Sequence, residues 1–321
     1  MAVTIEEPEF PASPSYPTTL PGGFEKRVES SHSRFLSYLA DQDHWTSQGE
    51  KNDVRLWKRT DPDEPNGLPY VKGETVVKNC TPDAFGLGVV QMPGMRKLWD
   101  PRCEKGFMIE RYCPKTVMFW ALTKGKKYIA SPRDIVGVQR NYTDDDGTLR
   151  MVQTSVEDTE RAPEQPGTTR ADLVMSGWQF KPEGPDLRVT YIFKIRLAGR
   201  LPNSIVSYAT TETPLCTGRA RDVFYQHGFA PYVKNTHGDS SIIFQNEHFD
   251  AETRKYRCQL TTGSTTAERF KIVYDKEKMY KSGIVVAIDG DAVDAQDDGM
   301  GGVAVVTMTP KTNAAVDISP K

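Results

Sequence analysis

The side chains that most often perform chemistry are scattered along this chain without the spacing that a catalytic or metal site needs. No pair of histidines has H-x-x-H, H-E-x-x-H or H-x-x-x-H spacing, and a zinc site needs several such ligands together. The sequence has no G-x-S-x-G elbow and no P-loop lysine. We therefore expect no catalytic residues, no metal and no cofactor. The histidines are His32, His44, His227, His237 and His248.

The bulk composition is that of a globular protein. Of 321 residues, 37% are hydrophobic and 26% charged, and the net charge is −2, which gives no reason to expect a nucleic-acid partner. The five cysteines form no C-x-x-C pair, which is typical of a reducing compartment. The acidic N-terminus resembles no signal peptide, and no apolar run approaches the roughly 18 residues of a spanning helix. We expect a cytoplasmic protein whose membrane contact, if any, is local and transient.

The order of predicted elements favours an α+β fold. Helical spacing predicts a first helix over residues 31–47, and Thr81-Pro82-Asp83 is a good helix start. Six runs with β-branched and aromatic enrichment follow between residues 107 and 196. An apolar stripe then predicts a long helix over Leu201–Val233, kinked at Pro214. Strands with helices at both ends suggest an antiparallel sheet that grips a helix.

The two ends of the chain differ from this middle part. Five prolines and little apolar surface predict a flexible tail over residues 1–23. Residues 241–321 carry further strand-like runs and an acidic, glycine-rich loop. We predict a β-rich C-terminal extension there, either a small module or strands docked on the first domain. The predicted main domain is then 24–240.

Four motifs occur in a fixed order within the main domain. They are Trp99-Asp100; Ser131-Pro132-Arg133-Asp134-Ile135-Val136; Thr154-Ser155-Val156-Glu157 followed by Ser176-Gly177-Trp178; and Thr190-Tyr191-Ile192 followed by Gly199-Arg200-Leu201-Pro202-Asn203-Ser204. Together they resemble the START (StAR-related lipid transfer) family over about residues 30–235. The resemblance implies a helix-grip fold, in which a curved antiparallel sheet wraps a long C-terminal helix around an apolar cavity. Family members bind sterols, phospholipids, sphingolipids or other hydrophobic ligands.

The resemblance also implies roles for single residues. Asp100 falls where the ceramide-transfer member has an acidic group, and Gln153 where that member has a polar amide. Gln139 replaces the cavity arginine of the sterol-binding members, which argues against sterol selectivity. Trp120 and Trp178 are either cavity wall or ordinary core, because aromatic residues dominate cores anyway. Tyr191 is a further cavity candidate.

A basic loop precedes the second motif and corresponds to the family's omega loop beside the tunnel mouth. Its lysines could each contribute about 1 kcal/mol on an anionic membrane, and its bulky residues suit the water–lipid boundary. An ordinary basic loop is the alternative. The membrane-contact residues predicted here are Lys124, Lys126, Lys127, Tyr128 and Ile129.

The preferred hypothesis is non-catalytic binding, and intermembrane transfer, of one lipid. Two alternatives remain open: a helix-grip enzyme, such as a cyclase or hydrolase, and a lipid-sensing regulatory module. The enzyme would need an acid or base with a shifted pKa in the cavity, for which Asp100 is the candidate.

Overall fold

The structure, a computed structural model, describes residues 19–125, 131–197, 210–234, 242–262, 268–290, 293–307 and 313–321. Within these ranges, ten strands form one sheet in the order β1-β2-β3-β10-β9-β7-β6-β5-β4, with β8 beside β6. Every pairing is antiparallel except that of β6 with β8. The antiparallel sheet predicted from the strand-like runs is therefore confirmed. The strands are β1 Thr46–Lys51, β2 Val54–Arg59, β3 Tyr70–Val77, β4 Cys103–Cys113, β5 Thr116–Thr123, β6 Arg133–Thr143, β7 Leu149–Ser155, β8 Thr169–Arg170, β9 Asp172–Glu183 and β10 Asp186–Arg196.

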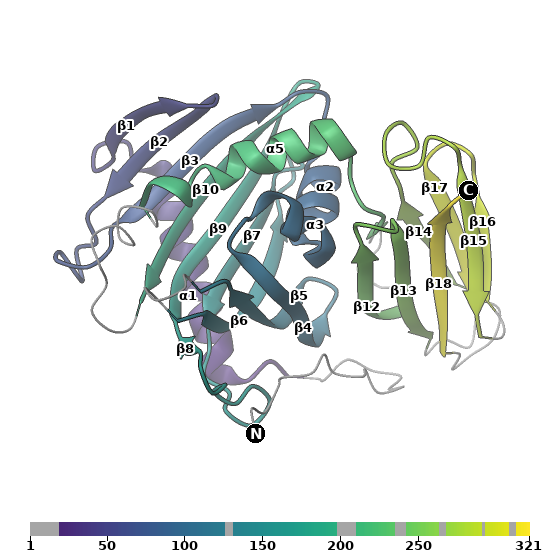
Figure 1. Cartoon of the computed structure of the whole chain (residues 1–321), viewed down its shortest axis with the longest axis horizontal. Coiled ribbons are helices and arrows are strands. Elements are labelled where there is room, and N and C mark those ends of the chain that lie inside the picture. The colour runs from purple at the N-terminus through teal and green to yellow at the C-terminus, as the bar shows by residue number, and fades with distance from the viewer. Residues whose placement is uncertain are drawn as a thin grey trace.

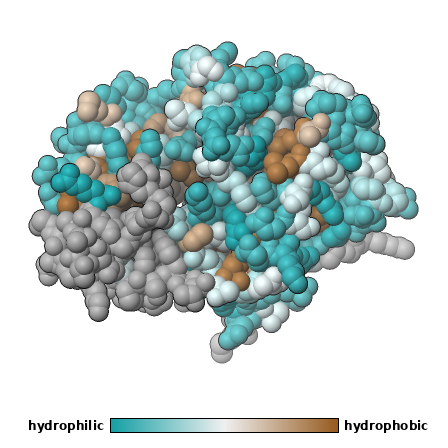
Figure 2. Space-filling view, turned by 180° about the vertical axis from the view of Figure 1, so that it is seen from behind, coloured by the Kyte–Doolittle hydropathy of each residue, from teal (hydrophilic) through white to brown (hydrophobic). Residues whose placement is uncertain are grey.

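Helices cover both faces of this sheet (Figure 1). Helix α1 (Gly22–Ala40) packs behind it against β7 and β9. On the other face lie α2 (Pro82–Phe85), the π-helix η1 (Gly86–Gln91), α3 (Pro93–Trp99) and α5 (Cys216–His227). Seen from behind, the molecule is largely hydrophilic with small, separate apolar patches (Figure 2). No helix in the described residues is long and apolar enough to span a bilayer.

The first helix was placed too late in the sequence. It begins at Gly22, and its buried face is formed by Val28, Ser31, Phe35 and Tyr38, at spacings of three and four residues. Its first turns carry few apolar side chains, so a hydrophobic pattern alone missed them. Trp45 lies beyond the helix and packs edge-on against Tyr38.

The short helices follow the predicted start signals. Thr81 caps α2, since its Oγ1 accepts a hydrogen bond from the backbone N–H of Ala84 at 3.3 Å, and Pro82 fills the first turn. Helix α3 likewise begins at Pro93 and ends at Trp99, two residues before Pro101. These signals fix the place where the chain turns from α3 into β4.

The long C-terminal helix is corrected by the structure. The described helix α5 spans only Cys216–His227 and ends at Gly228, whose φ is +78°. Tyr232–Lys234 is strand β11, so the predicted end at Val233 is wrong. The predicted start at Leu201 lies outside the described residues. Pro214 precedes α5, and its carbonyl lies so close to Gly73 of β3 that a side chain would not fit there.

The C-terminal strands form two four-stranded sheets beside α3 and α5 (Figure 1). Their buried apolar residues share one core cluster with η1, α3 and α5, so this unit is docked on the first domain. The division at residue 241 stays a prediction, and β11 lies before it in the sequence. The sheets are β11-β14-β17-β16, with β14 Glu268–Val273, β17 Gly302–Thr307 and β16 Val293–Asp297, and β12-β13-β18-β15, with β12 Ile242–Asp250, β13 Lys255–Thr262, β18 Asn313–Pro320 and β15 Ile284–Asp289.

Candidate functional site

A cavity of about 420 Å³ lies on the face of the main sheet that α3 and α5 cover. Alternate side chains of a strand point to the same face, so β10 contributes Tyr191, Phe193 and Ile195. Phe119 and Ala121 of β5 extend this apolar wall. The volume falls within the range of about 300–1,000 Å³ that is usual for small-molecule sites. The other lining residues are Arg96, Asp100, Pro101, Arg102, Thr123, Lys124, Gly125, Ser131, Arg133, Ile135, Gln153, Leu173, Ser176, Leu197 and Thr213.

Trp120 lies away from this cavity. It follows Phe119 on β5 and therefore points to the opposite face, where it packs with Phe107 and Val28. Its Nε1 donates to Asp134 at 3.0 Å. Asp134 is fully buried and also binds Arg170, whose Nη2 is 2.9 Å away, so this motif aspartate is structural. Phe119 takes the place in the cavity wall that the sequence resemblance gave to Trp120.

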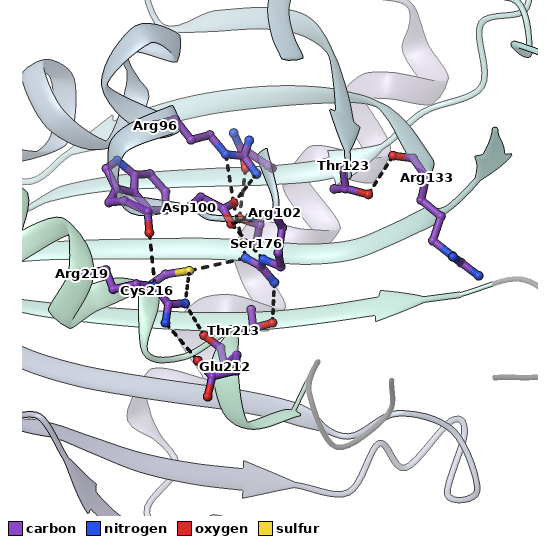
Figure 3. Close-up of polar contacts among 12 residues, drawn as sticks. Arg96, Asp100, Arg102, Thr123, Arg133, Ser176, Glu212, Thr213, Cys216 and Arg219 are labelled. Atoms are coloured by element: carbon purple, nitrogen blue, oxygen red, sulfur yellow. Dashed lines mark hydrogen bonds and ion pairs between the residues drawn. The ribbon is translucent and has the colours of Figure 1, made fainter. Parts of the chain in front are cut away.

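One end of the cavity is formed by Arg96, Asp100 and Arg102, and we call it the Asp100 end. Asp100 ends α3, and its Oδ1 accepts hydrogen bonds from the backbone N–H of Arg102 at 3.1 Å and from Arg102 Nε at 2.9 Å. Its Oδ2 lies 3.1 Å from Arg96 Nη2 (Figure 3). Two guanidinium groups around one carboxylate leave the Asp100 end with one excess positive charge.

The carboxylate of Asp100 is occupied by these contacts. It accepts five N–H groups from Arg96 and Arg102, which uses the roughly four lone-pair positions it has. Burial alone would raise the pKa of Asp100, but Arg102 and Arg96 outweigh it and hold that pKa well below its usual range. Asp100 is therefore ionised at neutral pH and orients two arginines.

A chain of polar side chains runs from the cavity along the sheet. Ser176 Oγ lies 3.5 Å from the hydroxyl of Tyr191 and 3.0 Å from Gln153 Oε1. Gln153 Nε2 donates to Gln139 Oε1 at 2.7 Å, and Gln139 continues to Gln91 at 2.9 Å. Gln139 and Trp178 line a hollow of only about 30 Å³ behind the main cavity, which Tyr191 and Gln153 border as well. The chain holds Gln153 and Ser176 in fixed orientations at the cavity surface.

A second polar cluster connects the Asp100 end to α5. Arg102 Nη1 donates to Thr213 at 2.6 Å, and the sulfur of Cys216 lies 3.4 Å from Arg102 and 3.3 Å from Arg219 (Figure 3). Burial raises the pKa of the Cys216 thiol despite these cations, so it stays protonated. Arg219 also pairs with Glu212 at 3.1 Å. The cluster positions Arg102 and offers no nucleophile.

Another part of the cavity border, here called the Lys124 end, is formed by Lys124, Gly125, Ser131 and Arg133. It adjoins the Asp100 end, because the backbone N–H of Lys124 donates to the carbonyl of Arg102 at 2.8 Å. Arg133 donates through Nη1 to the carbonyl of Ser131 at 2.8 Å, and its Nε is buried with no hydrogen-bond partner among the described residues. Lys124 is exposed. The predicted contact residues Lys126, Lys127, Tyr128 and Ile129 lie outside the described residues.

Sequence reasoning missed the two arginines of the Asp100 end. Arg96 lies one helical turn before Asp100, and Arg102 follows Pro101 directly. The spacing R-x-x-x-D-x-R could therefore have indicated two arginines beside the aspartate. Phe193 and Ile195 were equally detectable, because they continue the alternation from Tyr191 along β10.

The open antiparallel sheet with helices on both faces defines the α+β helix-grip class of fold, which differs from a closed barrel and from a doubly wound parallel sheet. A family model described as the START domain matches residues 28–214, and the chain belongs to this family. That membership supports lipid binding at the level of the family. No curated protein sequence matches the chain.

Two solved structures share the fold. Human StAR-related lipid transfer protein 5 aligns with a TM-score of 0.58 and 22% identity, over 64% of this chain and 99% of that one. Human STARD10 aligns with a TM-score of 0.54 and 16% identity, over 62% of this chain and 79% of that one. At these identities the likeness concerns the fold alone. It confirms the predicted α+β helix-grip class, with the β-rich C-terminal sheets as an addition.

Proposed function

We propose that this chain binds one amphiphilic lipid without chemical conversion and carries it between membranes. The observation that carries the proposal is the cavity itself, which has an apolar wall and cationic side chains at its border, among them Arg96, Arg102 and Lys124. Burial of a lipid chain contributes about 0.8 kcal/mol per methylene group, so this wall can hold a lipid with no covalent step.

The Asp100 end favours a headgroup that accepts hydrogen bonds. Asp100 has no acceptor capacity left, whereas Arg96 and Arg102 present donors and an excess positive charge. Arginine binds phosphate and carboxylate oxygens with good geometry. A phospholipid therefore fits this end better than a sterol or a ceramide, whose hydroxyl groups carry no charge.

An enzymatic role has less support. Asp100 was the candidate acid or base, but Arg102 and Arg96 keep its pKa low and its oxygens occupied. Tyr191 lines the cavity with a pKa that burial raises far above neutrality, so it is not a base. Cys216 is a buried thiol.

The Lys124 end is the proposed membrane-facing end in the cytoplasm. Lys124 both lines the cavity and is exposed, so a membrane bound there would lie next to the lipid's path. The adjoining segment contains Lys126, Lys127, Tyr128 and Ile129, which would add charge and a shallow apolar anchor.

The experiment is lipid transfer between vesicles. Donor vesicles contain phosphatidylcholine, phosphatidylserine, cholesterol and ceramide, acceptor vesicles lack a tracer, and radiolabelled tracers report each lipid class in turn. The proposal predicts protein-dependent transfer of a phospholipid ahead of cholesterol and ceramide. Transfer no faster than without protein, for every class, would contradict it.

A further inference from the structure

Helix α3 lies between the cavity and the C-terminal sheets. Arg96 and Trp99 of α3 point toward the cavity and the hollow behind it. On its other side, Gly94 packs so closely against β12 that an added Cβ would overlap the carbonyl oxygen of Phe249. Phe249 is itself 2% exposed and belongs to the core cluster shared with Trp99. The backbone of β12 therefore limits how far α3 can lie from the main sheet.

A buried carboxylate fixes β12 at this place. Glu247 Oε1 accepts hydrogen bonds from the backbone N–H of Val233 at 2.9 Å and from the hydroxyl of Tyr256 at 2.8 Å. Its other oxygen lies 4.0 Å from Arg111 Nη2, on strand β4 of the main sheet. Glu247 thus connects β11, β12 and β13 with the strand that follows the Asp100 turn.

The end of α5 is held by the same unit. Lys278 donates through Nζ to the carbonyl of Phe224 at 3.3 Å and lies 4.8 Å from the ring of that residue. A Cβ on Gly228 would overlap the carboxylate of Asp275. Helix α5 carries Cys216 and Arg219 at its other end, which contact Arg102 and the carbonyl of Trp99. The C-terminal unit therefore contacts both helices that position the Asp100 end.

We propose that the C-terminal β unit, formed by strands β11 to β18, is a positioning element of the lipid site. Its contact with α3 through Gly94 and Phe249 holds Arg96 and Asp100 in their binding positions. Lipid affinity and docking of the unit are then thermodynamically linked, so that each strengthens the other by the same factor. The predicted effect on lipid affinity rests on the proposed function, whereas the positioning of α3 can be tested without ligand.

The test uses the full chain and Gly94→Ala, with Gly23→Ala as the matched control. Both glycines are the second residue of a helix, where alanine favours helix formation by roughly 1 kcal/mol over glycine. A Cβ at Gly23 meets nothing within 4 Å, whereas one at Gly94 pushes α3 away from Phe249. Hydrogen exchange of the α3 amides is measured without lipid. Lipid occupancy is measured by native mass spectrometry after incubation with the four-lipid vesicles described above.

We expect Gly94→Ala to speed exchange in α3 at least fivefold and to lower lipid occupancy at least threefold, with Gly23→Ala like the wild type. Unchanged α3 exchange and unchanged occupancy in Gly94→Ala would overturn the inference while leaving lipid binding intact. Wild-type protein that takes up no lipid would instead overturn the proposed function, and the exchange result would still decide whether the unit positions α3.

A second comparison protects against a Gly94→Ala protein that fails to fold. Glu247→Gln keeps the shape and weakens the link to Arg111. The control Arg257→Gln removes two partly exposed ion pairs on the same unit, with Asp289 and Asp317. Lipid loading of wild-type protein should slow exchange in β12 and β13 at least threefold, and Glu247→Gln should reduce this effect while Arg257→Gln does not. The linkage would be overturned if wild-type protein binds lipid and hydrogen exchange in β12 and β13 stays at the rate of the lipid-free protein.

Discussion

Arg102 binds Asp100 from within the same turn, with its Nε 2.9 Å and its backbone nitrogen 3.1 Å from Asp100 Oδ1. This arrangement makes the acidic residue a support for the arginine. The residue that meets the ligand in our account is therefore the cation, although the sequence drew attention to the acid.

Replacing Asp100 with asparagine should destabilise the protein by about 3 kcal/mol, because it leaves two arginines without their buried counter-ion. Arg102 and Arg96 lower the folded-state pKa of Asp100 despite its burial, so its contribution is complete above the unfolded value of about 3.9 and is lost as the pH falls below it. The gap between wild type and variant in urea unfolding should therefore shrink from pH 6 toward pH 3. A gap that is constant or grows would contradict the ion-pair account.

Arg102→Gln should weaken phospholipid binding about tenfold, since a hydrogen bond to a charged group contributes about 1.5–3 kcal/mol. Binding of cholesterol should change much less. Arg150→Gln, which removes a pair with Asp144 on the β6–β7 hairpin, is the control. Competition between labelled phosphatidylcholine and cholesterol measures both. Equal losses for the two lipids would show that Arg102 acts through stability alone.

Ile195→Trp should fill part of the cavity and abolish lipid uptake while the protein stays folded. Ile195 is only partly buried and lines the cavity, so the added ring has space to enter. Lys181→Trp adds the same ring to an exposed position of β9 and should not affect uptake. Circular dichroism confirms folding, and lipid extraction measures uptake. A lipid-loaded Ile195→Trp protein would place the ligand elsewhere.

Charge reversal at the Lys124 end should slow transfer between vesicles that contain phosphatidylserine. Lys124→Glu changes an attraction of about 1 kcal/mol into a repulsion that screens within about 8 Å at physiological salt. Transfer should fall severalfold at low salt and recover toward wild type at high salt. Lys181→Glu is the exposed control. A variant that transfers at the wild-type rate at low salt would exclude this membrane contact.

Most strands of the main sheet were predictable from sequence. The six runs predicted between residues 107 and 196 coincide with β4, β5, β6, β7, β9 and β10. A turn that ends in Gly147, at φ +81°, joins β6 to β7. The alternation of apolar and polar residues and the turn residues are local signals, so they can be recognised without knowledge of the tertiary structure. Strand β1 was not predicted, because all six of its residues are exposed and its sequence has no alternation of apolar and polar side chains.

The site was predictable in part. Gln153 and Tyr191, two of the predicted cavity residues, border the cavity, and their roles toward a ligand stay predictions. Which face of β5 meets the cavity depends on where α1 packs, and a short sequence window cannot show this, so the sequence alone did not single out Phe119. The contact of Gly94 with Phe249 joins residues 155 positions apart and leaves no local pattern at all.

The central claim is that the cavity holds one lipid, and native mass spectrometry of the full-length protein tests it most directly. Wild-type protein and Ile195→Trp are each incubated with vesicles of phosphatidylcholine, phosphatidylserine, cholesterol and ceramide, separated from them, and sprayed without denaturation. We predict one bound phospholipid per wild-type chain and none on Ile195→Trp. A wild-type protein that carries no lipid, or equal lipid on both proteins, would contradict the account.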